Sequence, residues 1–405
     1  MTTHLDDHRP STASAGGGDD VVVVGAGLAG LSVAWELARR GARVRILDRD
    51  APGRATSRVA AGMLAPITEA EADDPEQLRL GLAALERWPA YAAALEAASG
   101  IPLPVLRQPT LVVARDRDEA EALRRFADVR ERLGLPVERL LPSDARTREP
   151  GLAPTLRGAL SIADEQAVDP RVVVRALAAA AVQAGVRMAT GPGSAVEALR
   201  HEDGRVTGVR TADGLELPAG AVVLAAGAWS AAIDGIPDGA RLPLRPVKGQ
   251  LLVLRDPSGP GLVGRVLRFG GGYLVPRDDG RYVLGATTEE RGFDLATTAW
   301  AVHDLLRDGA ELVPGILELE LLETLVGLRP TTPDGHAAIG PAAELDGLWW
   351  ATGHYRNGVL LASLTGALLA DGLTGAAADP DLSALADPRR FATVADAPGT
   401  EEADA

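Results

Sequence analysis

Residues 21–48, VVVVGAGLAGLSVAWELARRGARVRILD, carry the strongest structural signal in the chain. The first four are β-branched and stop at Gly25, as in a buried strand of a parallel sheet. Apolar residues then recur at helical spacing until Gly41, and Val44–Leu47 forms a second apolar run that ends at Asp48. Strand, helix and strand in this order predict a complete βαβ unit.

A Gly-x-Gly-x-x-Gly pattern, formed by Gly25, Gly27 and Gly30, lies at the first strand-to-helix turn. Because these residues lack side chains, the backbone can approach a pyrophosphate at the positive end of the helix. Asp48 can accept hydrogen bonds from both ribose hydroxyls, and its charge disfavours a 2′-phosphate. The pattern predicts a site for FAD or NAD rather than NADP. It does not separate FAD from NAD, and an ordinary glycine-rich turn is the alternative.

The composition is that of a folded protein. Hydrophobic residues make up 46% and charged residues 24% of 405 residues, a length that suggests about two or three folding units. No apolar run reaches the roughly 18 to 20 residues of a membrane span, so we expect a cytoplasmic protein. The net charge of −15 makes nucleic acid an unfavourable partner. Because the chain has no cysteine, disulfides, thiolate nucleophiles and cysteinyl attachment of a cofactor are excluded.

Later segments predict further helices and strands, with a change from parallel to antiparallel topology. Helices are expected at 75–99, 118–133 and 171–184, and strands at 111–114, 186–189, 206–210, 222–225 and 251–254. Tyr273–Pro276 and Tyr282–Ala286 are expected to form an antiparallel pair, because Asp-Asp-Gly between them favours a tight turn. Near the end, a strand at Leu348–Ala351 leads through Gly353–Gly358 into a closing helix at Val359–Leu369.

Four more motifs accompany the glycine turn. They are Ala-Gly-Met-Leu at 61–64, Pro-Val-Lys-Gly-Gln at 246–250, Gly-Leu-Arg-Pro at 327–330 and Gly-His-Tyr-Arg-Asn-Gly-Val-Leu-Leu at 353–361. Together with Val-Gly-Ala-Gly-Leu-Ala-Gly at 24–30, they resemble the D-amino-acid oxidase superfamily of FAD-dependent oxidoreductases, and within it the glycine-oxidase branch. The resemblance runs from about residue 20 to residue 375, and the last motif is the most distinctive. It implies FAD rather than NAD.

The resulting prediction is an α/β protein of two interleaved domains. One is a Rossmann-like FAD-binding domain, and the other is a substrate domain built on an antiparallel sheet. We assign residues 19–85, 171–230 and 325–385 to the FAD-binding domain, and 86–170 and 231–324 to the substrate domain. Residues 1–18 are expected to be a disordered tail and 386–405 a second tail, since both are rich in small and polar residues.

By resemblance, FAD is contacted by the glycine turn, by small residues after the second strand and by the loop before the closing helix. The implied cofactor-binding residues are Gly25, Gly27, Leu28, Ala29, Gly30, Asp48, Arg49, Thr56, Ser57, Ala61, Gly62, Met63, Val196, His354, Tyr355, Arg356, Asn357, Gly358, Val359 and Leu360. Free N–H groups of the loop before the helix could stabilise negative charge on a reduced flavin. With no cysteine in the chain and no histidine between Asp48 and Leu64, we expect FAD to be bound noncovalently.

Members of this family bind the carboxylate of an amino acid through arginine, which implies Arg329 and Arg356, with the hydroxyl of Tyr273 as a partner. A planar guanidinium can hold a carboxylate through two parallel hydrogen bonds, which also fixes the adjacent α-carbon. No metal site and no side-chain base are expected.

The chain departs from the family pattern beside Tyr273. Gly271 and Gly272 stand where bulkier side chains are common, and Thr288 stands where an apolar residue is expected. We therefore expect a roomier or rearranged pocket, which would admit larger primary or secondary amines. Lys248, the only lysine, invites a role in oxygen activation near the flavin, but support of a loop is the favoured interpretation.

The resemblance implies oxidative deamination of glycine or other small amino acids. Hydride passes from the α-carbon to the flavin, the imine gives a 2-oxo acid and ammonia or feeds the thiazole branch of thiamine biosynthesis, and O2 is reduced to hydrogen peroxide. The alternatives are a sarcosine or D-amino-acid oxidase or dehydrogenase, an NAD-dependent dehydrogenase, and a catalytically silent dinucleotide-binding protein. The expected partners are the amino acid and O2. A homo-oligomer fits the family, but the sequence does not choose the oligomeric state.

Overall fold

The valine run forms the centre of a parallel sheet. In the computed structural model, which describes residues 19–71 and 74–392, β1 pairs in parallel with β2 on one side and β12 on the other, and its four valines are buried. The sheet has the order β10-β11-β12-β1-β2-β9, with β19 beside β12 and β18 beside β19. Its strands are β1 (Asp19–Val24), β2 (Val44–Asp48), β9 (Arg187–Thr190), β10 (Val196–Glu202), β11 (Arg205–Thr211), β12 (Glu216–Leu224), β18 (Ala338–Pro341) and β19 (Leu348–Thr352).

Four helices cover one face of this first sheet, and β10 and β11 cover part of the other. The helices are α1 (Leu28–Arg39), α4 (Pro75–Ser99), α7 (Pro170–Gln183) and α9 (Ala362–Thr374). Trp35 of α1 and Trp88 of α4 belong to the buried cluster on the helical face. On the opposite face Val22 packs with Leu199 and Val209 of the β10–β11 hairpin. Both faces of β1 are therefore buried, which explains its unbroken apolar sequence.

The second large sheet has the order β17-β13-β16-β15-β14-β5-β7-β6. Its strands are β5 (Thr110–Ala114), β6 (Val137–Leu140), β7 (Gly158–Ile162), β13 (Arg245–Arg255), β14 (Leu267–Phe269), β15 (Gly272–Pro276), β16 (Arg281–Gly285) and β17 (Glu320–Thr331). Neighbouring strands are antiparallel except β14 and β5, which are parallel. α5 (Arg117–Arg132) and α8 (Ala299–Leu312) pack on this sheet through separate buried clusters.

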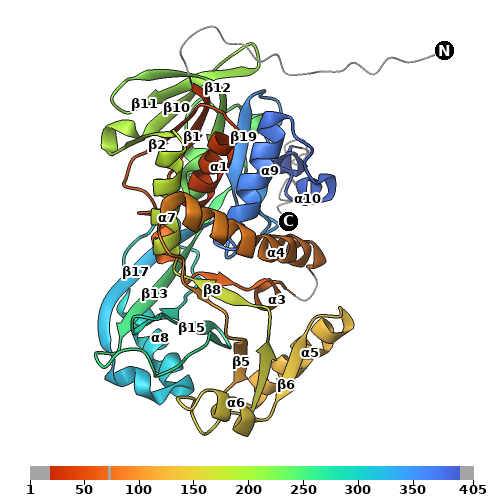
Figure 1. Cartoon of the computed structure of the whole chain (residues 1–405), viewed down its shortest axis with the longest axis vertical. Coiled ribbons are helices and arrows are strands. Elements are labelled where there is room, and N and C mark those ends of the chain that lie inside the picture. Colours follow the sequence, from red (N-terminus) through yellow and green to blue (C-terminus); the bar gives the residue numbers. More distant parts are fainter. Residues whose placement is uncertain (1–18, 72–73, 393–405) are drawn as a thin grey trace, which may run out of the picture.

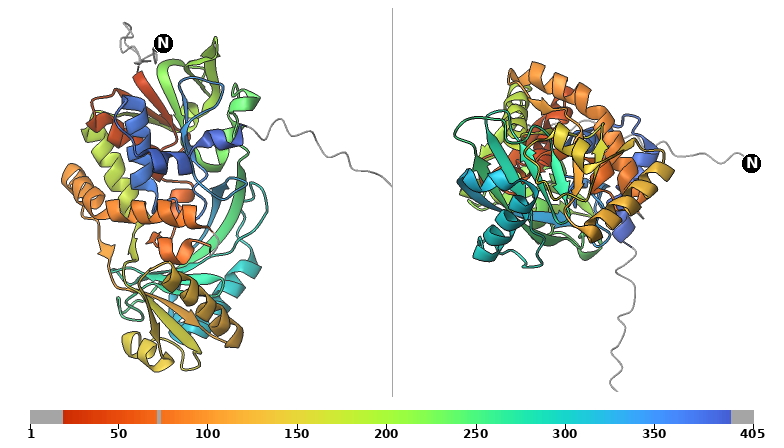
Figure 2. Two further views of the ribbon diagram at one scale, coloured as in Figure 1. Left: turned by 90° about the vertical axis from the view of Figure 1, so that its right-hand side faces the viewer. Right: turned by 90° about the horizontal axis from the view of Figure 1, so that it is seen from below.

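Shorter elements lie outside the two large sheets and their main helices. A three-stranded sheet has the order β3-β8-β4, and the small helices precede or follow it. These elements are α2 (Thr56–Val59), β3 (Met63–Leu64), α3 (Pro66–Glu69), β4 (Val105–Leu106), α6 (Pro142–Arg148), β8 (Gln166–Val168) and α10 (Pro380–Leu385). Figure 1 and the left view of Figure 2 show the first sheet in the upper half of the molecule and the second in the lower half, with α4 (orange) near the boundary.

The domain boundaries expected from the sequence differ from the structure at two positions. The boundary at residue 85 falls inside α4, whose second half packs in the same buried cluster as α1, so the chain leaves the first sheet and its helices only after Leu103. The boundary at residue 325 falls inside β17, which pairs with β13 from Glu320 to Thr331 and so belongs to the second sheet. Neither element is interrupted there, because α4 continues to Ser99 and β17 stays paired with β13 on both sides of residue 325.

The expected C-terminal tail also begins too early. Ala386 is fully buried, and its carbonyl accepts a hydrogen bond of 2.8 Å from the Ile339 N–H, so residues up to 392 pack on β18. Residues 1–18 and 393–405 of the two expected tails lie outside the described residues.

The closing helix starts at Ala362 rather than Val359, so a turn separates Gly358 from α9. Within the described ranges, no helix combines the length and apolarity that crossing a membrane requires.

Candidate active site

A cavity of about 1050 Å³ is lined by residues of both large sheets. It extends from the glycine turn, past α2 and the 61–63 segment, to the inner strands of the second sheet and the loop before α9. Its volume exceeds the upper range of typical small-ligand pockets, about 1,000 Å³. The cavity therefore has room for a large ligand whose ends lie in different domains.

The glycine turn is built for close approach of backbone to a ligand. Gly25 has φ +112°, and a Cβ atom at Gly30 would overlap the carbonyl oxygen of Gly25. Asp48 Oδ2 accepts a hydrogen bond of 2.6 Å from the Ala26 N–H, and Ser57 Oγ accepts one of 3.1 Å from the Leu28 N–H. These contacts hold the turn open at the N-terminus of α1, which is the arrangement that a pyrophosphate requires. The residues present therefore fit FAD.

The carboxylate at the end of β2 lines the same cavity. Burial raises the pKa of Asp48, although hydrogen bonds from the Ala26 and Asp50 N–H groups oppose that effect. A partly buried carboxylate with remaining lone pairs matches the ribose-binding role implied by the sequence.

Most of the residues implied for FAD binding line the cavity. The exceptions are Gly30, Asn357 and Leu360. Gly30 instead packs α1 against Gly25, while Leu360 is in the core and its carbonyl accepts a hydrogen bond of 2.8 Å from Trp88 Nε1. Asn357 is buried beside the loop, where its carbonyl accepts from the Leu361 N–H. These three residues do not line the cavity, and they support it by packing against neighbouring elements.

The three residues implied for substrate binding all line this cavity, although they come from different elements. Arg329 projects from β17, Tyr273 from β15, and Arg356 from the loop before α9. Arg329 Nη1 donates to the carbonyl oxygen of Thr287 at 3.1 Å, and Arg356 Nη2 lies 3.4 Å from Thr288 Oγ1. Burial raises the pKa of Tyr273, opposed by the charge of Arg329, so its hydroxyl is neutral at pH 7. The arrangement offers two cations and one hydroxyl to an anionic ligand.

An ion pair in the same cavity was not anticipated from the sequence. Glu69 Oε1 accepts a hydrogen bond from Arg268 Nη1, and the side chains of Arg268 and Glu69 are only 16% and 8% exposed. Glu69 ends α3 and Arg268 lies in β14, so 199 positions separate them in sequence. An acid three residues after the helix-starting Pro66, following Ala-Gly-Met-Leu, was the available signal for Glu69. Nothing distinguishes Arg268 from the other arginines.

The glycines beside Tyr273 open the pocket less than expected. Gly271 and Gly272 both line the cavity, but a Cβ atom at Gly272 would lie 2.5 Å from Cζ of Phe269. The ring of Phe269 therefore occupies the space that a larger side chain at 272 would need. Thr288 is exposed at the cavity and faces Arg356. At Gly271, by contrast, no atom lies within 4 Å of the position that a Cβ atom would take.

Lys248 supports a loop. Its side chain is completely buried, and Nζ donates hydrogen bonds of 2.6 Å to Asp294 Oδ2 and to the carbonyl oxygen of Ala296. Lys248 is absent from the cavity lining. The ammonium group is therefore engaged with the 294–296 segment rather than with a ligand.

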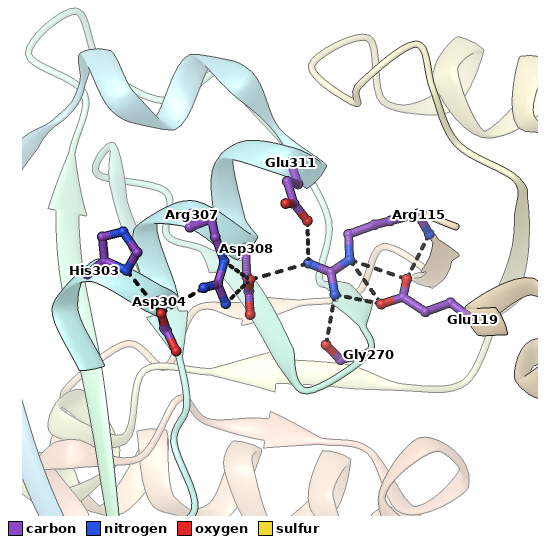
Figure 3. Close-up of polar contacts among 8 residues, drawn as sticks. All are labelled: Arg115, Glu119, Gly270, His303, Asp304, Arg307, Asp308 and Glu311. Atoms are coloured by element: carbon purple, nitrogen blue, oxygen red, sulfur yellow. Dashed lines mark hydrogen bonds and ion pairs between the residues drawn. The ribbon is translucent and has the colours of Figure 1, made fainter. Parts of the chain in front are cut away.

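One side of the cavity is formed by α8 and carries acidic groups. Asp304 and Asp308 line it, and Figure 3 shows both engaged with basic neighbours. Arg307 Nη1 lies 2.8 Å from Asp304 and Arg307 Nη2 lies 2.9 Å from Asp308. Arg115 pairs with Glu119, reaches Glu311 at 3.1 Å, and donates to the carbonyl oxygen of Gly270 at 3.3 Å. The network ties α8 and α5 to the glycine-rich loop before β15.

Comparison with known proteins gives a consistent result. The protein family described as FAD dependent oxidoreductase (DAO) matches residues 20–372. A glycine oxidase of Geobacillus kaustophilus is 35% identical over 361 residues, which cover 87% of this chain and 92% of that protein. The bifunctional protein ThiO/ThiG of Trichormus variabilis is 35% identical over 90% of this chain, which spans 54% of its length.

The fold of the chain is also similar to that of a solved glycine oxidase. The crystal structure of glycine oxidase from Geobacillus kaustophilus superposes with a TM-score of 0.84 at 34% identity, covering 91% of this chain and 97% of that chain. The family match, residues 20–372, spans both large sheets and every residue that lines the cavity.

Proposed function

The chain belongs to the DAO family of FAD-dependent oxidoreductases, and from this premise we propose that it oxidises glycine, with O2 as electron acceptor. The products are the imine, which water converts to a 2-oxo acid and ammonia, and hydrogen peroxide. By analogy with the ThiO/ThiG relative, the product serves the thiazole branch of thiamine biosynthesis. Sarcosine and small D-amino acids are the second candidate substrates, because the cavity is open at Gly271 and Thr288.

One observation carries the proposal: a single cavity joins the glycine turn to Arg329, Arg356 and Tyr273. Two guanidinium groups can fix the carboxylate of an amino acid, and a neutral hydroxyl can donate a further hydrogen bond to it. A ligand held in this way has its α-carbon at a defined position, which supplies the orientation that a direct transfer needs.

FAD, when bound, supplies the two-electron acceptor for the hydride of the α-carbon. The protein binds and orients the amino acid in a cavity whose walls include Phe269 and residues of α8. We assign no side chain as catalytic base, because the neutral amine can release hydride without one. The cofactor is held noncovalently, so acid precipitation should leave the yellow colour in the supernatant.

Replacing Arg329 by alanine tests the carboxylate site. Loss of one partner of a charged clamp costs roughly 2 to 5 kcal/mol, so we expect kcat/KM for glycine to fall at least about 30-fold, mainly through KM. FAD content should stay near that of the wild type, because Arg329 is at the substrate end of the cavity. Peroxide formation and the visible spectrum measure the two quantities.

Arg58→Ala is a matched control for this variant. Arg58 lies in α2 near the cavity but pairs with Glu323 at 2.8 Å and does not line it. Its loss should leave kcat/KM for glycine within about twofold. Unchanged glycine kinetics in Arg329→Ala would contradict the carboxylate site. A peroxide assay with glycine, sarcosine and D-alanine separates the candidate substrates.

A further inference from the structure

Trp229 lines the cavity and is absent from the residues that the sequence implied for FAD binding. It lies in a 3-10 helix, η2 (Gly227–Ala232), shortly after β12, whereas Arg49 directly follows β2. The Arg49 guanidinium carbon is 4.3 Å from the centre of the Trp229 ring. Because β12 and β2 flank β1 in the parallel sheet, this contact spans the carboxyl end of β1, where the glycine turn begins.

This end of the cavity fits the adenosine half of a dinucleotide. Asp48, the acid at the end of β2, lines it next to Arg49, and such an acid binds the ribose beside the adenine. A planar guanidinium stacks favourably on aromatic rings, and both flat groups can contact a ligand. Trp229 is half-buried and the side chain of Arg49 is 47% exposed, so a ligand in the cavity can reach both.

Phe293, in the loop between β16 and α8, contacts the same tryptophan. The ring centres of Phe293 and Trp229 are 5.6 Å apart, and the ring planes are inclined by 40°. This separation lies within the range of favourable aromatic pairs. Phe293 is half exposed and does not line the cavity, so its effect on a ligand there is indirect.

The loop that carries Phe293 is fixed to β13 by the two polar side chains of the Pro-Val-Lys-Gly-Gln motif. Lys248 Nζ donates to Asp294 Oδ2 at 2.6 Å. Gln250 Oε1 accepts from the Thr298 N–H at 2.9 Å, and Gln250 Nε2 donates to Thr298 Oγ1 at 3.1 Å. Lys248 and Gln250 are both buried. The loop is therefore held on both sides of Phe293 and Asp294, which limits where the phenylalanine ring can lie.

We propose that Trp229 and Arg49 together bind the adenosine half of FAD, and that Phe293 is a positioning residue that braces Trp229 from the substrate domain. The inference depends on FAD binding and not on which substrate is oxidised, so it goes beyond the proposed function. It also gives Lys248 a part in cofactor retention, because Lys248 holds the loop whose phenylalanine supports one wall of the FAD site.

Phe293→Ala tests the brace. Serial dilution of the FAD-bound protein, followed by the fluorescence of released flavin, gives the dissociation constant of FAD. We expect this constant to rise about threefold to tenfold, which corresponds to the loss of one aromatic pair. Phe293→Tyr keeps the ring and should stay within about twofold of the wild type. Leu295→Ala is the matched control, because Leu295 is a similarly exposed apolar residue of the same loop, and it should also stay within about twofold.

A double-mutant cycle distinguishes the brace from a general effect on the fold. Trp229→Ala alone should weaken FAD binding at least about tenfold, because the ring and its hold on Arg49 are lost together. In that background Phe293→Ala should weaken binding by less than about twofold more, since no ring remains to be braced. Equal effects of Phe293→Ala in both backgrounds would overturn the brace, and unchanged FAD affinity in Trp229→Ala would overturn the binding role of the tryptophan.

The Phe293 variants test the inference even if Trp229→Ala does not fold, because the replaced side chain is half exposed. The bound flavin in Phe293→Ala should keep the absorption maxima of the wild type, since the stacked groups lie at the adenosine end. Displaced maxima, unchanged FAD affinity in Phe293→Ala, or equal weakening in Leu295→Ala would each contradict the inference. If glycine does not reduce the wild-type flavin, the proposed function fails, while these binding results are unaffected.

Discussion

His354 illustrates how single residues around the cofactor loop are fixed. The residue lines the cavity but is buried, and Nε2 of its ring lies 2.9 Å from Thr365 Oγ1. The Thr365 hydroxyl donates to the Leu361 carbonyl at 2.9 Å, so it accepts from the imidazole, and Nε2 carries the hydrogen. Burial lowers the pKa of His354 to about 4, and the ring is neutral at pH 7.

This depressed pKa predicts acid sensitivity. Between pH 6.5 and 4 the unfolded chain takes up a proton at this histidine that the folded protein does not. As the pH is lowered through this range, the free energy of unfolding should therefore decrease by up to about 1.4 kcal/mol per pH unit from this group alone. Glutamine can donate the same hydrogen bond without titrating, so His354→Gln should show a shallower slope in denaturant titrations over that range. Equal slopes would contradict the assignment.

At the scale of elements, facing glycines allow the two longest strands of the second sheet to form the substrate end of the cavity. Gly249 of β13 stands opposite Gly327 of β17. A Cβ atom at Gly327 would lie 3.0 Å from Val59 of α2, and one at Gly249 would lie 2.5 Å from the guanidinium of Arg329. Because both positions lack side chains, α2 can pack against Gly327 and the guanidinium of Arg329 can lie against Gly249.

Gly249→Ala should displace the Arg329 guanidinium, because a methyl group and the guanidinium cannot share the same space. We expect kcat/KM for glycine to fall about tenfold while FAD remains bound, since a small misplacement of a positioning group weakens orientation. Gly158→Ala is the control, because the nearest atom to its added Cβ is 3.8 Å away. Steady-state kinetics that respond equally to both substitutions would contradict this role for Gly249.

At the scale of the whole molecule, a buried arginine connects the second sheet to segments that pack with the first sheet. Arg277, which follows β15, donates a hydrogen bond of 2.5 Å to the carbonyl oxygen of Ala61 and lies 4.0 Å from Asp169 at the start of α7. Arg281 of β16 reaches the same aspartate at 2.9 Å. Burial lowers the pKa of Arg277 to about 10, so the group remains charged at pH 7.

Removing Arg277 should loosen the junction between the two halves. Arg277→Ala leaves the Ala61 carbonyl and part of Asp169 without a partner, and we expect a loss of about 3 kcal/mol in the free energy of unfolding. Because Ala61 lines the cavity, FAD should also dissociate more readily. Arg79→Ala, which removes an exposed pair with Asp381, should cost less than about 1 kcal/mol. Thermal unfolding with flavin fluorescence reports both effects, and equal losses in the two variants would argue against the junction.

The local pattern of residues 21–48 was sufficient to predict β1, α1, β2 and the glycine turn. The reason is that each of these features depends on neighbours within a few residues, through strand burial, helical periodicity and the absence of side chains. The resemblance added Arg329 and Arg356, which lie in short contiguous motifs, and Tyr273, which lies outside those motifs. All three residues line the same cavity, and the variants above test their roles in binding.

The tertiary structure decided what local patterns do not encode. The pairing of Glu69 with Arg268 joins positions 199 residues apart, and the contact of Phe293 with Trp229 joins segments that follow strands of different sheets. The same is true of the packing of Phe269 over Gly272 and of the continuation of α4 and β17 through the expected domain boundaries. Burial and long-range pairing depend on how sheets and helices come together, whereas periodicity and glycine spacing are properties of the chain itself.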